Sequence, residues 1–112
     1  MLTILSELPN GFLDCAAEDL YQIFGGPTLI HLSGKQARPL FVSILLHGNE
    51  ISGLLAVQEV LSGYQGSELP RACSLFVGNV CAAQAGVRYL PGQHDFNRIW
   101  FDGRDEEHLM RM

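Results

Sequence analysis

Residues 40–50 read LFVSILLHGNE, and they indicate the fold class more clearly than any other part of the chain. The run from Leu40 to Leu46 is apolar except for Ser43. A nearly continuous apolar run of this kind is typical of a strand that is covered on both faces in an α/β sheet. We therefore predict an interior strand over Leu40 to Leu46.

A helix and a second strand follow this strand. From Glu50 to Leu61 the apolar residues form a broad helical stripe, and Ser62-Gly63 ends it. The residues from Ala72 to Val77 repeat the strand pattern, and a polar, glycine-containing stretch through Gln93 follows. The order strand, helix, strand predicts a parallel pair of strands joined by a right-handed crossover.

The residues before Leu40 add two elements to this prediction. Ala17, Leu20, Tyr21 and Phe24 recur at helical spacing after Asp14, and glycines follow them. They indicate a helix of about three turns. The β-branched and apolar run from Thr28 to Leu32 indicates a short strand. The whole pattern belongs to the α/β class.

Composition limits the classes of function. The chain has 112 residues, of which 47% are hydrophobic, so one compact domain is expected. The net charge of −5 and the lack of a Lys/Arg cluster argue against a nucleic-acid partner. No apolar run is long enough to span a membrane, and the N-terminus lacks the pattern of a secretory signal, so we expect a cytoplasmic protein. The three scattered cysteines indicate buried free thiols.

His47 and Glu50 are the first candidates for chemistry. His47 directly follows the predicted strand, and Glu50 begins the predicted helix after the turn at Gly48-Asn49. Ligands of open α/β sheets bind at the carboxyl ends of strands, and an imidazole nitrogen and a carboxylate oxygen are zinc ligands. We expect Gly48 to serve the turn because glycine tolerates left-handed backbone angles. Alternatively, His47 caps the sheet edge and Glu50 complements the helix dipole.

A second group of polar residues lies near the C-terminus, where Arg88-Tyr89 precedes Asp95-Phe96-Asn97-Arg98. Arginine can bind a carboxylate with two hydrogen bonds or polarise a carbonyl oxygen, and asparagine adds an amide donor. An anionic substrate fits this set. Alternatively, Asp95 forms an ordinary surface ion pair with Arg98.

Together these motifs resemble those of the succinylglutamate desuccinylase/aspartoacylase family, within the zinc-carboxypeptidase-like superfamily. The matching motifs, in order, are His47-Gly48-Asn49-Glu50, Gly78-Asn79-Val80, Arg88-Tyr89 and Asp95-Phe96-Asn97-Arg98. The resemblance implies a three-layer α/β/α fold with a mostly parallel or mixed sheet. It also implies Zn²⁺ bound by His47 and Glu50, a scissile carbonyl polarised by Arg88, and a substrate carboxylate held by Asn97 and Arg98.

The chain departs from the family pattern in two places. Residues 90–94 form a connection slightly longer than the family's usual one. The family's third zinc ligand, a histidine, and its general base, a glutamate, have no counterpart up to Met112, because neither His94 nor His108 has the right context. We therefore expect residues 1–112 to be the N-terminal part of a catalytic domain, with negligible activity alone.

The leading hypothesis is a zinc-dependent deacylase acting on a small anionic N-acyl amino acid, such as an N-succinyl or N-acetyl acidic amino acid. The alternatives are a zinc carboxypeptidase and a truncated, non-catalytic module of the same fold. We also expect a homo-oligomer through an exposed sheet edge, since unpaired strand edges template pairing with another chain. The acyl group and the amino-acid portion are left open by the sequence.

Overall fold

The computed structural model describes residues 2–93 of the chain, and its centre is a mixed sheet of four strands. The strands are β1 (Thr3–Leu5), β2 (Thr28–Leu32), β3 (Gly34–Ile44) and β4 (Leu69–Val77). Their order across the sheet is β1-β2-β4-β3. β1 runs parallel to β2, β2 antiparallel to β4, and β3 parallel to β4. The predicted α/β class with a mixed sheet is thus confirmed.

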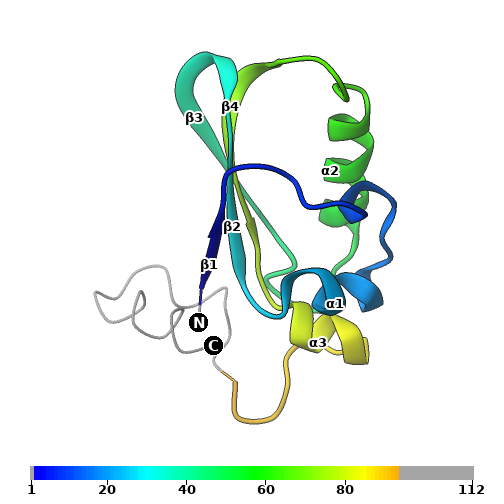
Figure 1. The fold of residues 1–112 in the computed structure, drawn as a ribbon. Coiled ribbons are helices and arrows are strands. Elements are labelled where there is room, and N and C mark those ends of the chain that lie inside the picture. The colour runs from blue at the N-terminus through cyan, green and yellow to red at the C-terminus, as the bar shows by residue number, and fades with distance from the viewer. Residues whose placement is uncertain (1, 94–112) are drawn as a thin grey trace, which may run out of the picture.

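Within residues 2–93, three α-helices accompany the sheet, and they lie on one of its faces (Figure 1). They are α1 (Leu20–Phe24), α2 (Ser52–Ser62) and α3 (Val80–Ala85). Two short 3-10 turns, η1 (Phe12–Asp14) and η2 (Ala17–Asp19), precede α1. Among residues 2–93 no helix forms the second outer layer of the expected three-layer arrangement.

The hydrophobic core lies between the sheet and these helices. Alternate strand residues point toward the helices because successive side chains of a strand face opposite sides. The buried core residues from the strands and the turn after β3 are Ile30, Ile44, Leu45, Leu75 and Val77, and those from the other segments are Phe12, Leu20, Leu54, Val80 and Ala83. The rings of Phe12 and Phe24 add an edge-to-face contact with centroids 5.8 Å apart.

The predicted strand over Leu40 to Leu46 is confirmed as a strand, but its predicted interior place is wrong for the described residues. β3 spans Gly34–Ile44, so it starts earlier and ends two residues sooner than predicted. It lies at the edge of the four-stranded sheet, where Leu40 and Phe41 are each 54% exposed. An apolar run does not by itself distinguish an edge strand from a central one, because both bury one face against helices.

The predicted strand–helix–strand order and the parallel pairing of its two strands are confirmed. β3, α2 and β4 follow one another, and the two strands pair in parallel from Leu40↔Cys73 to Ile44↔Val77. However, α2 begins at Ser52, so Glu50 lies in the connecting loop and not at the start of the helix. The stretch after β4 also contains α3, a short helix that the sequence pattern did not predict.

The predicted three-turn helix after Asp14 is wrong in its length. The backbone is extended at Cys15 and Ala16, which separates η1 from η2, and only Leu20–Phe24 is α-helical. The buried side chain of Gln58 explains the break. Its Nε2 donates to the carbonyl oxygens of Phe12 at 2.8 Å and of Cys15 at 2.7 Å, so these carbonyls are satisfied without a continuous helix.

Two further expectations can be compared with residues 2–93. None of the described helices has both the length and the apolar composition needed to cross a membrane. Cys15, Cys73 and Cys81 are free thiols as expected, although they are partly buried and not fully so.

Candidate functional site

The site is built on the turn that follows β3. The strand ladder ends at Ile44, and Leu45 adopts a left-handed backbone with a φ of 56° although it is not a glycine. Two amides from the chain after β4 hold this turn: Gly78 N donates to Ile44 O at 3.0 Å, and Asn79 N donates to Leu45 O at 2.7 Å. A left-handed leucine persists only where its surroundings fix it. Leu45 therefore redirects the chain as it leaves the sheet.

His47 and Glu50, the two predicted metal ligands, come together on this turn. The Nδ1 atom of His47 lies 2.8 Å from Oε1 of Glu50. The backbone closes the same turn, since Glu50 N donates to His47 O at 3.2 Å. The side chain of His47 is 8% exposed and that of Glu50 is 63% exposed. The pair thus joins a buried imidazole to a carboxylate that reaches solvent.

Gly48 fixes the distance between this turn and α3. A Cβ atom at Gly48 would lie 2.4 Å from Ala82 C and from Ala83 N, far inside van der Waals contact. The sequence led us to expect a left-handed backbone at Gly48, and this expectation is wrong, because the φ of Gly48 is not positive. Glycine is required by the close approach of the α3 backbone.

Arg88, the predicted catalytic residue, follows α3 and reaches the same turn through its backbone. Gly86, which has a φ of 69°, caps the end of α3, and Val87 N then donates back to Ala82 O at 3.1 Å. The amide of Gly48 donates to the carbonyl of Arg88 at 2.9 Å, and the Arg88 residue is exposed. The structure thus brings the backbone of Arg88 to Gly48, on the turn between His47 and Glu50. Asn97 and Arg98, the predicted substrate-binding residues, lie outside the described residues.

Sequence reasoning missed one part of this arrangement, a pair of amide side chains. Asn79 is buried at the N-terminus of α3, where its Oδ1 accepts from Ala82 N at 3.0 Å. Its Nδ2 donates to Oε1 of Gln93 at 2.9 Å, and Leu90 N donates to the same Gln93 oxygen at 2.8 Å. The signal was present, because asparagine before an alanine-rich run and a following glycine are typical helix boundaries.

The donors for a metal ion within residues 2–93 are the imidazole and the carboxylate of this turn. That part of the chain holds no group of three His, Cys, Asp or Glu side chains placed to bind one ion. Zinc ligands at about 2.1 Å in tetrahedral geometry lie about 3.4 Å from each other. The 2.8 Å separation of His47 and Glu50 is that of a hydrogen bond, so the two donors would have to move apart by about half an ångström.

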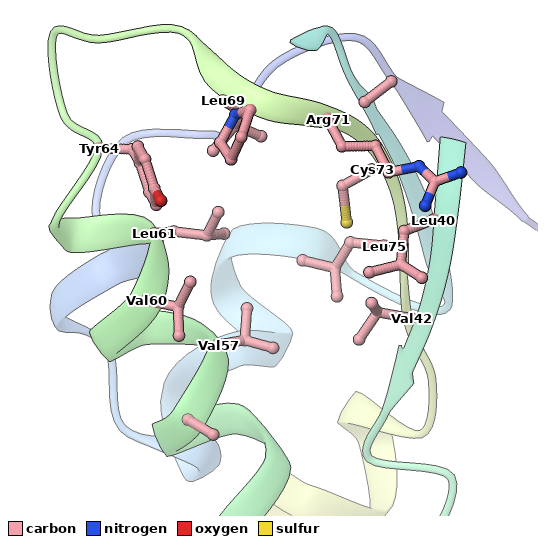
Figure 2. A pocket seen from close by; sticks show the side chains of 13 residues that line it. Leu40, Val42, Val57, Val60, Leu61, Tyr64, Leu69, Arg71, Cys73 and Leu75 are labelled. Carbon is pink, nitrogen blue, oxygen red and sulfur yellow. The ribbon is translucent and has the colours of Figure 1, made fainter. Parts of the chain in front are cut away.

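Two cavities lie near these elements, and they differ in character. An apolar cavity of about 340 Å³ lies between α2 and the strands β3 and β4 (Figure 2), and neither His47 nor Glu50 lines it. Leu40, Val42 and Leu75 point into it from the sheet, and Val57 and Leu61 from the helix. A more polar hollow of about 520 Å³ borders Asn49 and Glu50. Because this polar hollow lies at the Glu50 loop, it suits a small polar molecule better than the apolar cavity does.

Two thiols lie outside this turn and are less acidic than usual. Burial raises the pKa of Cys73, which lines the apolar cavity. Burial, followed by the charges of Asp19 and Glu18, raises the pKa of Cys15. Both thiols therefore stay protonated at neutral pH and are poor nucleophiles.

Comparisons with known proteins agree with the motifs of this turn. The model of the succinylglutamate desuccinylase/aspartoacylase catalytic domain matches residues 37–112. A succinylglutamate desuccinylase of Yersinia enterocolitica serotype O:8 / biotype 1B (strain NCTC 13174 / 8081) is 34% identical over 87 residues, which are 76% of this chain and 26% of that protein. The chain thus spans about a quarter of the length of that relative. No solved structure shows a significant match. From the matched residues we conclude that this chain belongs to the succinylglutamate desuccinylase/aspartoacylase catalytic domain family.

Proposed function

We propose that this chain contributes to a zinc-dependent deacylase that hydrolyses the amide bond of an N-acyl amino acid. One observation carries the proposal: the paired His47 and Glu50 side chains, 2.8 Å apart after β3, in a chain of this family. Their nitrogen and oxygen donors match the ligands that zinc prefers in hydrolases. The buried imidazole supplies a fixed donor, and the exposed carboxylate leaves the ion accessible to substrate.

His47 and Glu50 fit two positions of such a site. In the structure the carboxylate of Glu50 is an acceptor for His47 Nδ1, so this nitrogen carries the proton. Binding an ion through Nδ1 requires that proton to leave this nitrogen, because a metal ligand offers its lone pair. Zinc in a hydrolase site supplies Lewis-acid polarisation of the carbonyl and an acidified water.

We assign to Arg88 the stabilisation of the negative charge that develops on the scissile carbonyl oxygen. Its backbone is held beside His47 by the hydrogen bond from Gly48, and its residue is exposed. A guanidinium placed near such a site stabilises an oxyanion by charge and by hydrogen bonds. Asn97 and Arg98 are assigned to the substrate carboxylate, since an amide and a planar guanidinium suit that group.

The substrate class is a small anionic N-acyl amino acid, such as an N-succinyl or N-acetyl acidic amino acid. The guanidinium of Arg98 and the amide of Asn97 match a carboxylate of such a molecule. The name of the Yersinia relative, succinylglutamate desuccinylase, supports an N-succinyl amino acid. A carboxypeptidase would recognise a carboxylate in the same way, so the binding experiment described below also includes a peptide.

A zinc titration of the chain by calorimetry tests the metal site. We expect one ion per chain, bound more weakly than in a three-ligand site, and an affinity at least about tenfold lower for His47→Ala. His31→Ala is the matched control, because His31 is exposed on β2 and bonds to Ser74, 2.9 Å away. Binding that is unaffected by His47→Ala would contradict the assignment.

A second titration tests the substrate. N-succinyl-L-glutamate and a short peptide with a free C-terminus are added to the zinc-loaded chain, and binding is compared with that of Arg88→Ala. The deacylase proposal expects tighter binding of the N-acyl amino acid and a loss of that preference in the variant. Equal binding of both ligands, or tighter binding of the peptide, would favour the carboxypeptidase.

A further inference from the structure

The buried residue Asn79 connects three parts of the site: the turn before His47, the first turn of α3, and Gln93. Its backbone N–H donates to Leu45 O at 2.7 Å, on the turn that leads to His47. Its backbone oxygen and its Oδ1 accept from Ala83 N and Ala82 N, each at 3.0 Å, in the first turn of α3. Its Nδ2 donates to Gln93 at 2.9 Å. Asn79 is 1% exposed, so each of these groups would be costly to leave unpaired.

The hydrogen bonds determine how both amides are oriented. Asn79 must present its oxygen to Ala82 N, because a backbone amide can only donate. The side-chain nitrogen of Asn79 then faces Gln93, so Gln93 must accept this hydrogen bond through its side-chain oxygen. Leu90 N donates to that same oxygen at 2.8 Å, so turning the Gln93 amide over would break two hydrogen bonds. The bridge has one favoured arrangement.

Gln93 closes the segment that contains Arg88. This segment spans residues 87–93. Two consecutive residues attach its first end: Val87 N donates to Ala82 O, and Arg88 O accepts from Gly48 N. At its other end Gln93 N donates to Leu90 O at 3.1 Å, and the Gln93 side chain ties this turn to Asn79. Gln93 lies in residues 90–94, which connect the Arg88-Tyr89 motif to Asp95 in the sequence.

We propose that Asn79 and Gln93 are positioning residues, which together fix the Arg88 segment against the turn of His47 and Glu50. This inference rests on the proposed function, in which Arg88 acts on the substrate. One buried residue joins both segments, since the backbone N–H of Asn79 is bonded to Leu45 before His47 and its side chain is bonded to Gln93 after Arg88. Neither residue needs to touch the substrate to have this effect.

Three substitutions separate positioning from folding. Gln93→Ala removes the acceptor of both hydrogen bonds, whereas Gln93→Glu keeps an acceptor oxygen for each. Asn79→Asp keeps the oxygen that accepts from Ala82 N and so keeps the helix cap. It replaces the donor that faces Gln93 by a second oxygen, so Gln93 either loses its bond to residue 79 or turns over and loses the bond from Leu90 N.

Amide hydrogen exchange in the 112-residue chain, followed by NMR, is the first measurement. In Gln93→Ala and Asn79→Asp we expect the amides of Leu90 and Gly48 to exchange about five- to tenfold faster, as the loss of a hydrogen bond implies. The amides of Leu75 in the core and of Ala82 in the cap should keep their wild-type rates. Gln93→Glu should restore slow exchange at Leu90 and Gly48.

Unchanged exchange at Gly48 in both bridge-breaking variants would overturn the inference. An equal acceleration at Leu75 would also overturn it, because it would show a purely structural role. A titration with N-succinyl-L-glutamate, monitored at the Arg88 side-chain N–H, then tests the link to function. We expect the wild-type resonance to shift on binding and the Gln93→Ala variant to bind about tenfold more weakly.

The two proposals fail in different ways in this titration. No shift of the wild-type Arg88 resonance would contradict the proposed function and leave the exchange result standing. A shift with equal affinity in wild type and Gln93→Ala would contradict the positioning role.

Discussion

Substituting Gly48 by alanine should be among the most damaging single changes to this chain. The added Cβ would lie 2.4 Å from Ala82 C and Ala83 N and 2.6 Å from Ala82 Cβ. Carbon atoms in contact are about 3.5 to 4.0 Å apart, so the turn or α3 must move by about 1 Å. Backbone atoms, unlike the end of a flexible side chain, cannot move aside locally.

The cost of this movement has two parts. Overpacking of a well-packed interior costs about 1 to 3 kcal/mol. The same shift breaks the hydrogen bond from Gly48 N to Arg88 O, now 2.9 Å, which adds about 1 kcal/mol. Gly48→Ala is therefore expected to lower the free energy of unfolding by about 2 to 4 kcal/mol, a large part of the about 5 to 15 kcal/mol of a typical domain.

Urea unfolding followed by circular dichroism measures this loss. Gly63→Ala is the matched control, because Gly63 has a φ of −69° and an added Cβ would lie 3.4 Å from the nearest atom, Val60 O. That change should leave stability within about 1 kcal/mol of the wild type, and a small gain is expected from the reduced entropy of the unfolded chain. If Gly48→Ala were no more destabilising than Gly63→Ala, the close approach of the turn to α3 would be refuted.

Three further predictions concern other parts of the chain. Gln58→Leu should cost about 2 to 4 kcal/mol in urea unfolding, because it leaves the carbonyls of Phe12 and Cys15 without their donor, whereas Gln65→Leu at an exposed position should change little. Phe41→Lys should reduce any self-association seen by light scattering, because it places a charge on the edge strand β3. Leu55→Lys, at a residue of α2 with 56% exposure against 54% for Phe41, should not, and equal effects would argue against pairing through that edge. The rate at which iodoacetamide alkylates Cys73 should rise with pH, and the midpoint of this rise should lie above the usual cysteine pKa. Burial raises the pKa of Cys73 and so reduces the thiolate fraction at any given pH. A midpoint at or below the usual cysteine pKa would contradict this prediction.

The sequence predicted the elements that have strong hydrophobic periodicity. The strand–helix–strand unit around α2 was correctly predicted because its apolar residues repeat with the periods of strand and helix. The edge position of β3 was not predicted, since strand order depends on contacts between distant segments. The break after Phe12 depends on the side chain of Gln58, whose bonds to Phe12 and Cys15 span more than forty residues. Local pattern contains no signal for such a contact.

In the candidate site, too, the features set by the local sequence were predicted, and those that depend on distant contacts were not. The meeting of His47 and Glu50 was predicted because three residues across a tight turn bring two side chains together. The proximity of Arg88 to that turn was expected only from the family resemblance. It depends on the approach of α3 to Gly48, and this approach requires the folded β4 and α3. The bridge from Asn79 to Gln93 was missed because fourteen residues separate its ends.

The left-handed Leu45 places two opposing demands on one position. Its backbone favours glycine or asparagine, and the strain of keeping a leucine there costs about 1 to 2 kcal/mol. Its side chain is 2% exposed, and burial of a leucine contributes about 1.5 to 3 kcal/mol, so the core outweighs the backbone. Few amino acids satisfy both requirements. In a deep mutational scan, position 45 should therefore tolerate fewer replacements than the half-buried Leu46, and the turn that presents His47 has little freedom to drift.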